Sequence, residues 1–250
     1  FTELDKAFSA ARPGGTINIE SGVYDVNATI EKNLVIKGKG RDNVKLQGKE
    51  AGHPVLTVGS SATVSISGLT VQFALEGEGD DSCASEAKGI CPHGITARSS
   101  AKLDLTDVSI CGNWKGVRLT DNATAVIKDS LISRNRYYGF HLTENSSLTV
   151  TDSRVSEGSV GIYLENYAVA EIRNSTMEDF GNGFFLWDGS SATVKACKLA
   201  RMEFGAFLND RARIKILDNE IVEVESLKLN MPIFFSNKKK KSGNKIMKEV

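Results

Sequence analysis

Net charge is absent from this chain, because its 250 residues carry 31 Lys and Arg against 31 Asp and Glu. A nucleic-acid-binding domain usually needs a basic face, so this balance argues against nucleic acid as the main partner. Long apolar runs are also missing, and no stretch approaches the roughly 20 apolar residues that a membrane-spanning helix needs. The length is ample for one large core or two modest ones. We therefore expect a globular chain, and we expect it to be a monomer.

Cysteine and proline are scarce, with four of each, whereas glycine is frequent at 23 residues. The chain begins at Phe1 and shows no signal peptide, so we expect it to be processed or trimmed. The glycines are regularly spaced, which is the first sign of an internal repeat.

The repeat has a period of 22 or 23 residues. Six glycines mark it, and a second column follows thirteen residues after each of them with Asp or Asn at all but one place: Gly94, Gly116, Gly139, Gly161, Gly183 and Gly205, then Asp107, Asp129, Asp152, Asn174, Ala196 and Asp218. Two columns that keep the same phase over six copies predict a solenoid of stacked units.

Each unit contains three short stretches of period-two alternation, which is the signature of β-strands. In residues 139–160, Phe140 alternates with Leu142, and Leu148 alternates with Val150. Two inward columns follow from this phase: Leu105, Ile127, Val150, Ile172, Val194 and Ile216, and Leu103, Ala125, Leu148, Ala170, Ala192 and Ile214. A leucine-rich repeat has a similar period but wants a leucine where Asn145 stands, so we do not favour it.

Three strands per coil resemble the right-handed parallel β-helix of the pectate-lyase-like superfamily. The segments "ARPGGTINIESGVYDV" and "NLVIKGKG" strengthen the resemblance, because they look like the entry coils of that family. We expect an all-β domain over residues 1–236, with a capping helix at 2–12, a loop insertion at 72–92 and a basic tail or linker at 237–250. The resemblance implies that Cys197, in a column often filled by Asn, is a buried structural thiol.

Function must use outward positions, because the core takes the inward ones. The outward residues of the first strand form two columns, which we call the first-strand face: Thr57, Thr96, Arg118, His141, Tyr163, Phe185 and Phe207, and Gly59, Arg98, Thr120, Thr143, Glu165, Trp187 and Asn209. Aromatic rings beside cations suit a sugar chain, and the resemblance places the family's carbohydrate groove on the same sheet. We expect the ligand to contact Arg98, Arg118, His141, Tyr163, Glu165, Phe185, Trp187 and Phe207. A purely structural stack of these rings is the competing interpretation.

Catalysis is a second hypothesis for the same face. Arg118, His141, Tyr163 and Glu165 lie on neighbouring coils and have the residue types for proton transfer at a uronate carbon. This would suit a polysaccharide lyase or C5-epimerase. However, the family motifs "WIDH" and "DPHE" are absent, as are the paired aspartates of polygalacturonases.

The insertion at 72–92 is acidic and holds two of the four cysteines. Its oxygen ligands, including Asp80 and Asp81, suggest Ca²⁺ as the one cofactor to consider, although no EF-hand-like spacing is present. A disulfide can join Cys83 to Cys91, or Cys91 to Cys111, and either bridge implies an oxidising compartment.

The leading hypothesis is an extracellular or cell-surface β-helix that binds polysaccharide along the first-strand face. The alternatives are the lyase or epimerase just described, and a structural or adhesin-like stalk without a small ligand.

Overall fold

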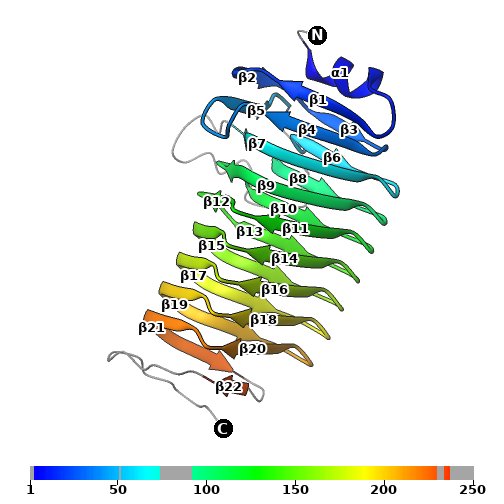
Figure 1. The fold of residues 1–250 in the computed structure, drawn as a ribbon. Helices are drawn as coiled ribbons and strands as arrows, with labels where there is room; N and C mark the ends of the chain where they lie inside the picture. The colour runs from blue at the N-terminus through cyan, green and yellow to red at the C-terminus, as the bar shows by residue number, and fades with distance from the viewer. Residues whose placement is uncertain (1–2, 51, 74–91, 230–233, 237–250) are drawn as a thin grey trace.

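The chain winds into a right-handed parallel β-solenoid of about nine turns (Figure 1). The computed structural model describes residues 3–50, 52–73, 92–229 and 234–236. In Figure 1 the turns stack from the blue N-terminal end to the orange C-terminal end, and the pairings between strands are parallel. The predicted fold class is thereby confirmed.

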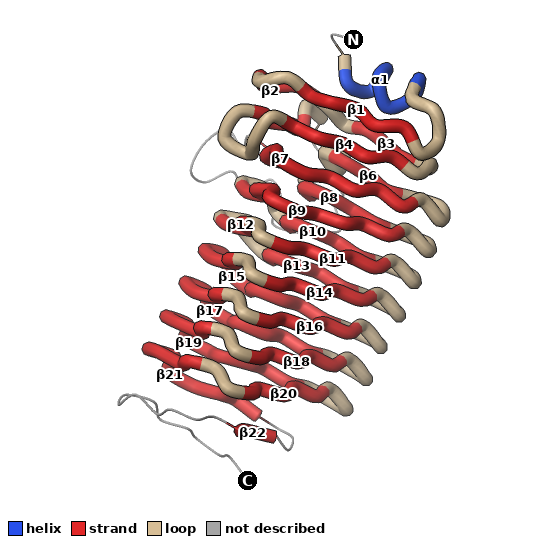
Figure 2. Tube along the Cα trace, viewed as in Figure 1, coloured by secondary structure: helices blue, strands red, loops and turns tan. Residues whose placement is uncertain are grey.

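Three parallel sheets run along the solenoid, and each turn adds one rung to each sheet (Figure 2). Six long strands pass through a corner and serve two sheets: β7 (Thr63–Phe73), β9 (Lys102–Cys111), β15 (Arg154–Leu164), β17 (Thr176–Leu186), β19 (Lys198–Leu208) and β21 (Glu220–Leu229).

The remaining strands belong to one sheet each. The first-strand sheet contains β3 (Ala28–Ile30), β6 (Leu56–Val58), β8 (His93–Ala97), β10 (Lys115–Leu119), β13 (Tyr138–Leu142) and the C-terminal halves of β15, β17, β19 and β21. The middle-strand sheet contains β1 (Gly15–Ile19), β4 (Leu34–Gly38), β11 (Thr124–Lys128), β14 (Ser147–Thr151), β16 (Val169–Arg173), β18 (Ser191–Lys195), β20 (Arg213–Leu217), β22 (Phe234–Ser236) and the N-terminal halves of β7 and β9. The third-strand sheet contains β2 (Gly22–Asp25), β5 (Val44–Gly48), β12 (Leu131–Ser133) and the other halves of the long strands.

The regular spacing of the repeat glycines has a steric cause. A Cβ atom added at Gly139 would lie 2.7 Å from the carbonyl oxygen of Gly161, and one added at Gly161 would lie equally close to that of Gly183. Each glycine therefore allows the backbone of the next turn to approach. Both predicted inward columns are buried, and they form the core together with the other inward residues.

The Asp column marks one corner of the coil, where the backbone turns through the left-handed region. Asp107, Asp129, Asp152, Asn174, Ala196 and Asp218 all have φ between 49° and 55°. Asp and Asn visit this region more readily than other residues with a side chain, which explains the column.

Beside that corner runs a column of hydrogen-bonding side chains, which we call the corner ladder: Ser130, Ser153, Ser175, Cys197 and Asn219. Each side chain accepts a hydrogen bond from the backbone N–H of the preceding column member, for example Ser130 N–H to Ser153 Oγ at 3.1 Å and Cys197 N–H to Asn219 Oδ1 at 2.7 Å. Cys197 is 3% exposed, so its prediction as a buried structural thiol is confirmed, and burial raises its pKa.

The ends of the chain match the predictions only in part. The capping helix α1 (Leu4–Ala10) is shorter than residues 2–12, and it buries Leu4, Ala7 and Phe8 against the first turn. At the C-terminal end, residues 228–229 pair with Phe207 and Leu208 as the next rung, and β22 joins the middle-strand sheet. Residues 74–91 and 237–250, and with them nearly all of the insertion and all of the tail, lie outside the described residues.

Candidate functional site

The first predicted column of the first-strand face is in register. Thr96 pairs with Arg118, Arg118 with His141, His141 with Tyr163, Tyr163 with Phe185, and Phe185 with Phe207. Successive rungs of a sheet are about 4.8 Å apart, so residues 22 positions apart in sequence become direct neighbours. The register predicted from the glycine spacing is therefore confirmed along this column.

The second column lies where the first strand turns into the next corner. Glu165 and Trp187 donate their backbone N–H groups to carbonyls of the preceding turn, those of Leu142 and Leu164. Arg98 is exposed, whereas Glu165 and Trp187 are half-buried. The structure thus places all eight predicted ligand-contacting residues along one face.

His141 is far less accessible than an outward position suggests, because it is only 6% exposed. The Lys115 ammonium lies 2.9 Å from its Nδ1, and the rings of Tyr138 and Tyr163 pack at 5.0 and 5.1 Å between centroids. Burial, followed by the charges of Lys115 and Arg118, lowers the pKa of His141 to about 2. His141 is therefore neutral at ordinary pH, and its Nδ1 accepts a hydrogen bond from Lys115.

Glu165 completes this group from the next turn. Its Oε2 accepts a long hydrogen bond from the Tyr163 hydroxyl at 3.4 Å, and its Oε1 lies 3.9 Å from His141 Nε2. Burial raises the pKa of the Glu165 carboxyl, and the nearby carboxylates of Glu144 and Asp188 act in the same direction. The structure therefore brings together three of the four residues predicted to be catalytic, while Arg118 occupies the rung beside His141.

Three buried donors along this side of the solenoid have no acceptor. Arg118 Nε, Trp187 Nε1 and Trp114 Nε1 are shielded from solvent and make no hydrogen bond in the part of the chain that the structure describes. A buried polar group without a partner costs about 1–3 kcal/mol, so native proteins rarely keep one without a reason. Acceptor oxygens of a bound ligand would satisfy these N–H groups.

The aromatic residues stack on one another, which departs from the expected flat platform. Tyr163 and Phe185 lie 5.5 Å apart with an interplanar angle of 12°, and Phe185 and Phe207 lie 4.6 Å apart at 15°. A ring stacked on both sides, such as Phe185, has no free face for a sugar. Trp187 is tilted by 32° to Phe185, so its ring does not share this stack. Trp187 is therefore the best placed of these rings to contact a sugar.

Sequence reasoning missed a group at the corner that leads into the first strand. Lys115 and Tyr138 precede the repeat glycines, a position outside the period-two alternation. Trp114 stacks on Tyr137 at 5.3 Å, and Tyr137 contacts Tyr138 at 4.3 Å, so the aromatic contacts continue around this corner. The clustering of aromatic and cationic letters in "NWK" and "NRYYG", just before two repeat glycines, was the available signal.

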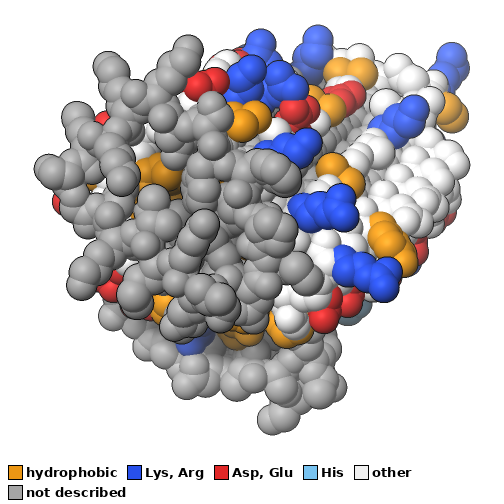
Figure 3. Space-filling view, turned by 90° about the horizontal axis from the view of Figure 1, so that it is seen from below, with side chains coloured by type: hydrophobic (Ala, Val, Ile, Leu, Met, Phe, Trp, Pro, Cys, Tyr) orange, Lys and Arg blue, Asp and Glu red, His pale blue; other side chains and the backbone are white. Residues whose placement is uncertain are grey.

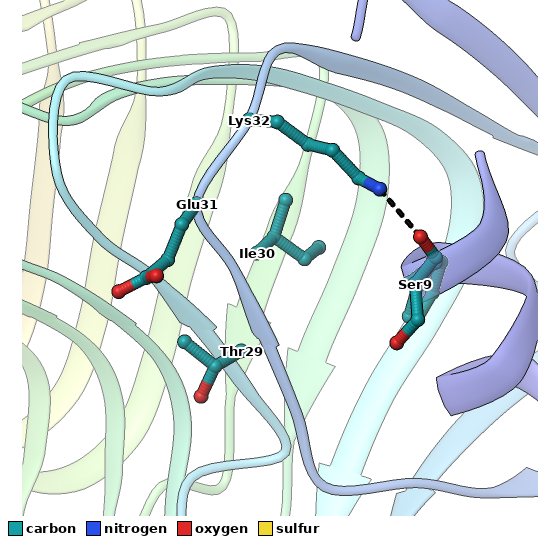
Figure 4. Close-up of a pocket in the computed structure, with 6 residues that line it drawn as sticks. Ser9, Thr29, Ile30, Glu31 and Lys32 are labelled. Atoms are coloured by element: carbon teal, nitrogen blue, oxygen red, sulfur yellow. Dashed lines mark hydrogen bonds between the residues drawn. The ribbon is translucent and has the colours of Figure 1, made fainter. Parts of the chain in front are cut away.

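Two hollows lie outside this face. One, of about 310 Å³, lies between α1 and the loop after β3, where Lys32 Nζ donates to the Ser9 carbonyl (Figure 4). The other, of about 400 Å³, is lined by Asp179, Phe180, Gly181, Arg201, Met202, Glu203, Glu223 and Glu225. Arg201 in this hollow is fully engaged, because it pairs with Glu178 and Asp179.

Charge is mixed over the visible surface. Seen from the C-terminal end, the Lys and Arg side chains that are not covered lie among uncharged and acidic ones (Figure 3). In the described residues, no group of three or more His, Cys, Asp or Glu side chains is arranged to hold a metal. Asp80, Asp81, Cys83 and Cys91 lie outside the described residues, so the Ca²⁺ and Cys83–Cys91 predictions remain predictions. Cys111 is a free thiol in the structure, so a Cys91–Cys111 bridge is not formed.

Comparison with known proteins agrees with this fold. A family profile described as "Right handed beta helix region" matches residues 93–243, and the chain belongs to that family. No curated protein sequence matches the chain. Among the described residues, no helix is long and apolar enough to cross a membrane.

Several solved structures of similar shape are named as enzymes that act on pectin or pectate, and another is a phage tailspike. A pectin methylesterase in complex with a hexasaccharide has a TM-score of 0.71 at 14% identity, covering 94% of this chain and 89% of that chain. The pectin methylesterase from Yersinia enterocolitica has a TM-score of 0.68 at 9% identity, covering 94% and 95%. Pectate lyase Pel9A has a TM-score of 0.60 at 12% identity, covering 96% and 73%. At these identities the likeness establishes the pectate-lyase-like β-helix fold.

Proposed function

We propose that this protein binds an acidic polysaccharide along the first-strand face, outside the cell or at its surface. The observation that carries the proposal is the set of buried donors that find no acceptor in the described part of the chain, two of which, Arg118 Nε and Trp187 Nε1, belong to this face. Sugar hydroxyls and carboxylates are acceptor-rich, so a uronate-containing chain supplies what these groups lack. Arg118 and the exposed Arg98 add positive charge, which favours a carboxylate over a neutral sugar.

The similar structures support the same ligand class. The pectin methylesterase complex contains a hexasaccharide, and pectin and pectate are polymers of uronate residues. A β-helix presents a long wall of equivalent rungs, which matches the shape of an extended polymer. The half-buried Trp187, tilted away from the ring stack, offers an apolar surface for a sugar beside the charged groups.

Affinity electrophoresis in gels containing polygalacturonate, alginate, hyaluronan or neutral xylan tests the proposal. We expect retardation in at least one acidic polymer. Arg118→Ala should weaken binding by roughly 10- to 150-fold, because a charge-assisted hydrogen bond contributes about 1.5–3 kcal/mol. Lys215→Ala and Val126→Ala, both exposed on the middle-strand sheet, are the controls and should bind like the parent. If the parent migrates without retardation in every gel, the binding proposal is wrong and the structural stalk becomes the favoured interpretation.

A second candidate, a uronate lyase or C5-epimerase, is favoured by the contacts among His141, Tyr163 and Glu165. Burial raises the pKa of Glu165, which makes its carboxyl a better proton acceptor than an exposed one, and the Tyr163 hydroxyl is within reach of it. Neutral His141, whose Nδ1 already accepts from Lys115, would orient these groups through Nε2 rather than act as the base. Incubation with uronate polymers and absorbance of the unsaturated product tests the lyase, and NMR of the sugar ring tests the epimerase. Unchanged polymer in both assays removes this candidate.

A further inference from the structure

The first-strand face is not uniform along the solenoid axis. Its N-terminal end carries Arg98 and Arg118, on two neighbouring turns. His141 adds no charge there, because burial keeps it neutral. Lys115 begins the same strand as Arg118 but is only 2% exposed, with its ammonium beside His141 Nδ1 and 5.4 Å from the centre of the Tyr138 ring. We call Arg98 and Arg118 the cationic end.

The other end of the face is apolar and uncharged. Phe185 and Phe207 stack in the first column, and Trp187 lies 5.6 and 6.2 Å from their centres in the second column. We call these three residues the aromatic end. From Arg118 to Phe207 is four rungs, a span of about 19 Å at about 4.8 Å per rung. Glu165 lies between the two ends and is the one acid in the two outward columns.

The corner that leads into the first strand repeats this asymmetry. Near the cationic end, the Arg136 guanidinium lies over Trp114 at 5.6 Å. Near the aromatic end, the hollow of about 400 Å³ is lined by Glu203, Glu223 and Glu225, all of them exposed. A carboxylate on a ligand is thus attracted at one end and repelled by like charges at the other.

Building on the proposed function, we infer that the ligand is a heteropolysaccharide of mixed charge, bound in one orientation. An acidic sugar lies over Arg98 and Arg118, and uncharged sugars lie over Trp187 at the aromatic end. A polymer with a carboxylate on every residue places negative charge beside Glu165 and the acidic hollow. Discrimination of this kind comes from repulsion of the wrong ligand as well as attraction of the right one.

Graded removal of carboxylates from one backbone tests the inference without changing the sugar chain. Galacturonan and alginate oligosaccharides are used intact, with about half of their carboxyls reduced to alcohols, and fully reduced. Calorimetric titration of the full chain then compares three ligands of equal length. We expect the half-reduced ligand of at least one backbone to bind about 10-fold more tightly than both its intact and its fully reduced forms.

Two variants test separately the roles of the cationic end and the aromatic end in this preference. Trp187→Ala should abolish the preference for half-reduced over intact ligand, and Arg118→Ala should abolish the preference for half-reduced over fully reduced ligand. Equal or tighter binding of the intact ligand by the parent overturns the inference and leaves the proposed function standing. Binding of none of the ligands overturns both. A Val126→Ala control, on the middle-strand sheet, should keep both preferences.

Discussion

The corner ladder and the first-strand face both repeat once per turn and both contain buried polar groups, and they differ in how the hydrogen bonds of these groups are completed. In the ladder, the Ser153 hydroxyl accepts from Ser130 N–H and donates to the Thr151 carbonyl. On the face, Arg118 Nε and Trp187 Nε1 are buried, and the described residues offer them no acceptor. The ladder side chains and the backbone groups beside them satisfy one another, whereas these two donors of the face have no partner among residues 3–50, 52–73, 92–229 and 234–236.

Because every turn has the same backbone, this difference in hydrogen bonding is what distinguishes the residues that stabilise the coil from those that we expect to bind a ligand. Buried polar groups that satisfy one another stabilise the coil, and their removal should affect folding. Buried polar groups left incomplete weaken the coil, and their removal should affect ligand binding instead. The following predictions test that division, from the largest expected effect to the smallest.

Asn219→Leu in the ladder should lower the free energy of unfolding by about 3 kcal/mol. It removes the acceptor of Cys197 N–H and the donor to the Val194 carbonyl, so both buried backbone groups lose a partner. Urea denaturation followed by circular dichroism measures the loss. Asn145→Leu, at an exposed corner position, is the control and should change the value by less than about 0.5 kcal/mol. A loss below about 1 kcal/mol for Asn219→Leu would show that the ladder is not the stabilising column.

His141 should make the protein sensitive to acid. Its pKa is about 2 in the folded chain and about 6.5 when unfolded, so the unfolded state binds the extra proton first. The contribution is complete above pH 6.5 and is lost on acidification toward pH 2, at about 1.4 kcal/mol for each pH unit. Denaturation at several pH values should show this slope in the parent and a shallower one in His141→Gln. The exposed His53→Gln control should keep the parental slope; the same slope in His141→Gln would contradict the assignment.

The sequence was sufficient to predict the solenoid and its register, because the same local constraints on the backbone recur in every turn. Gly139 and Asp152 recur in phase since a Cβ clash and a left-handed corner recur, and both are local constraints. The outward columns followed from period two. Lys115 and Tyr138 could not be found in this way, because they lie at the corner that leads into the first strand, where the alternation changes phase.

The chemistry of the face was less predictable than its position. The sequence gives no sign that Tyr163, Phe185 and Phe207 stack flat on one another, since side-chain rotation decides this rather than register. Likewise, His141 stands at an outward position but is covered by Lys115 and its aromatic neighbours. Such cover depends on long side chains from adjacent turns, which a pattern of single letters does not reveal.

Cys197 allows a gentler test of the ladder. Its Sγ accepts from Ser175 N–H at 3.5 Å, a weaker interaction than a hydroxyl makes in the same column. Cys197→Ser should retain or raise the free energy of unfolding by up to about 1 kcal/mol, while Cys197→Ala should lower it by about 1 kcal/mol. Thermal unfolding of the two variants side by side measures the difference. Equal stability of the two would mean that the side-chain acceptor at this rung contributes nothing.

Glu165→Gln should have the smallest effect, and in the direction opposite to the ladder variants. Burial raises the pKa of Glu165, so the folded chain holds its proton to higher pH than the unfolded chain, and stability falls as pH rises through that window. Gln removes the ionisation, so the free energy of unfolding at pH 7 should rise by less than about 1 kcal/mol, because the group is partly solvated. No rise is expected at a pH low enough to protonate Glu165 in both states. The control Glu171→Gln, on the middle-strand sheet beside Arg173, should show no such pH-dependent gain. A loss of stability in Glu165→Gln at pH 7 would show that the Glu165 carboxylate stabilises the fold, as the ladder side chains do. That result would contradict its assignment to the ligand-binding groups of the face.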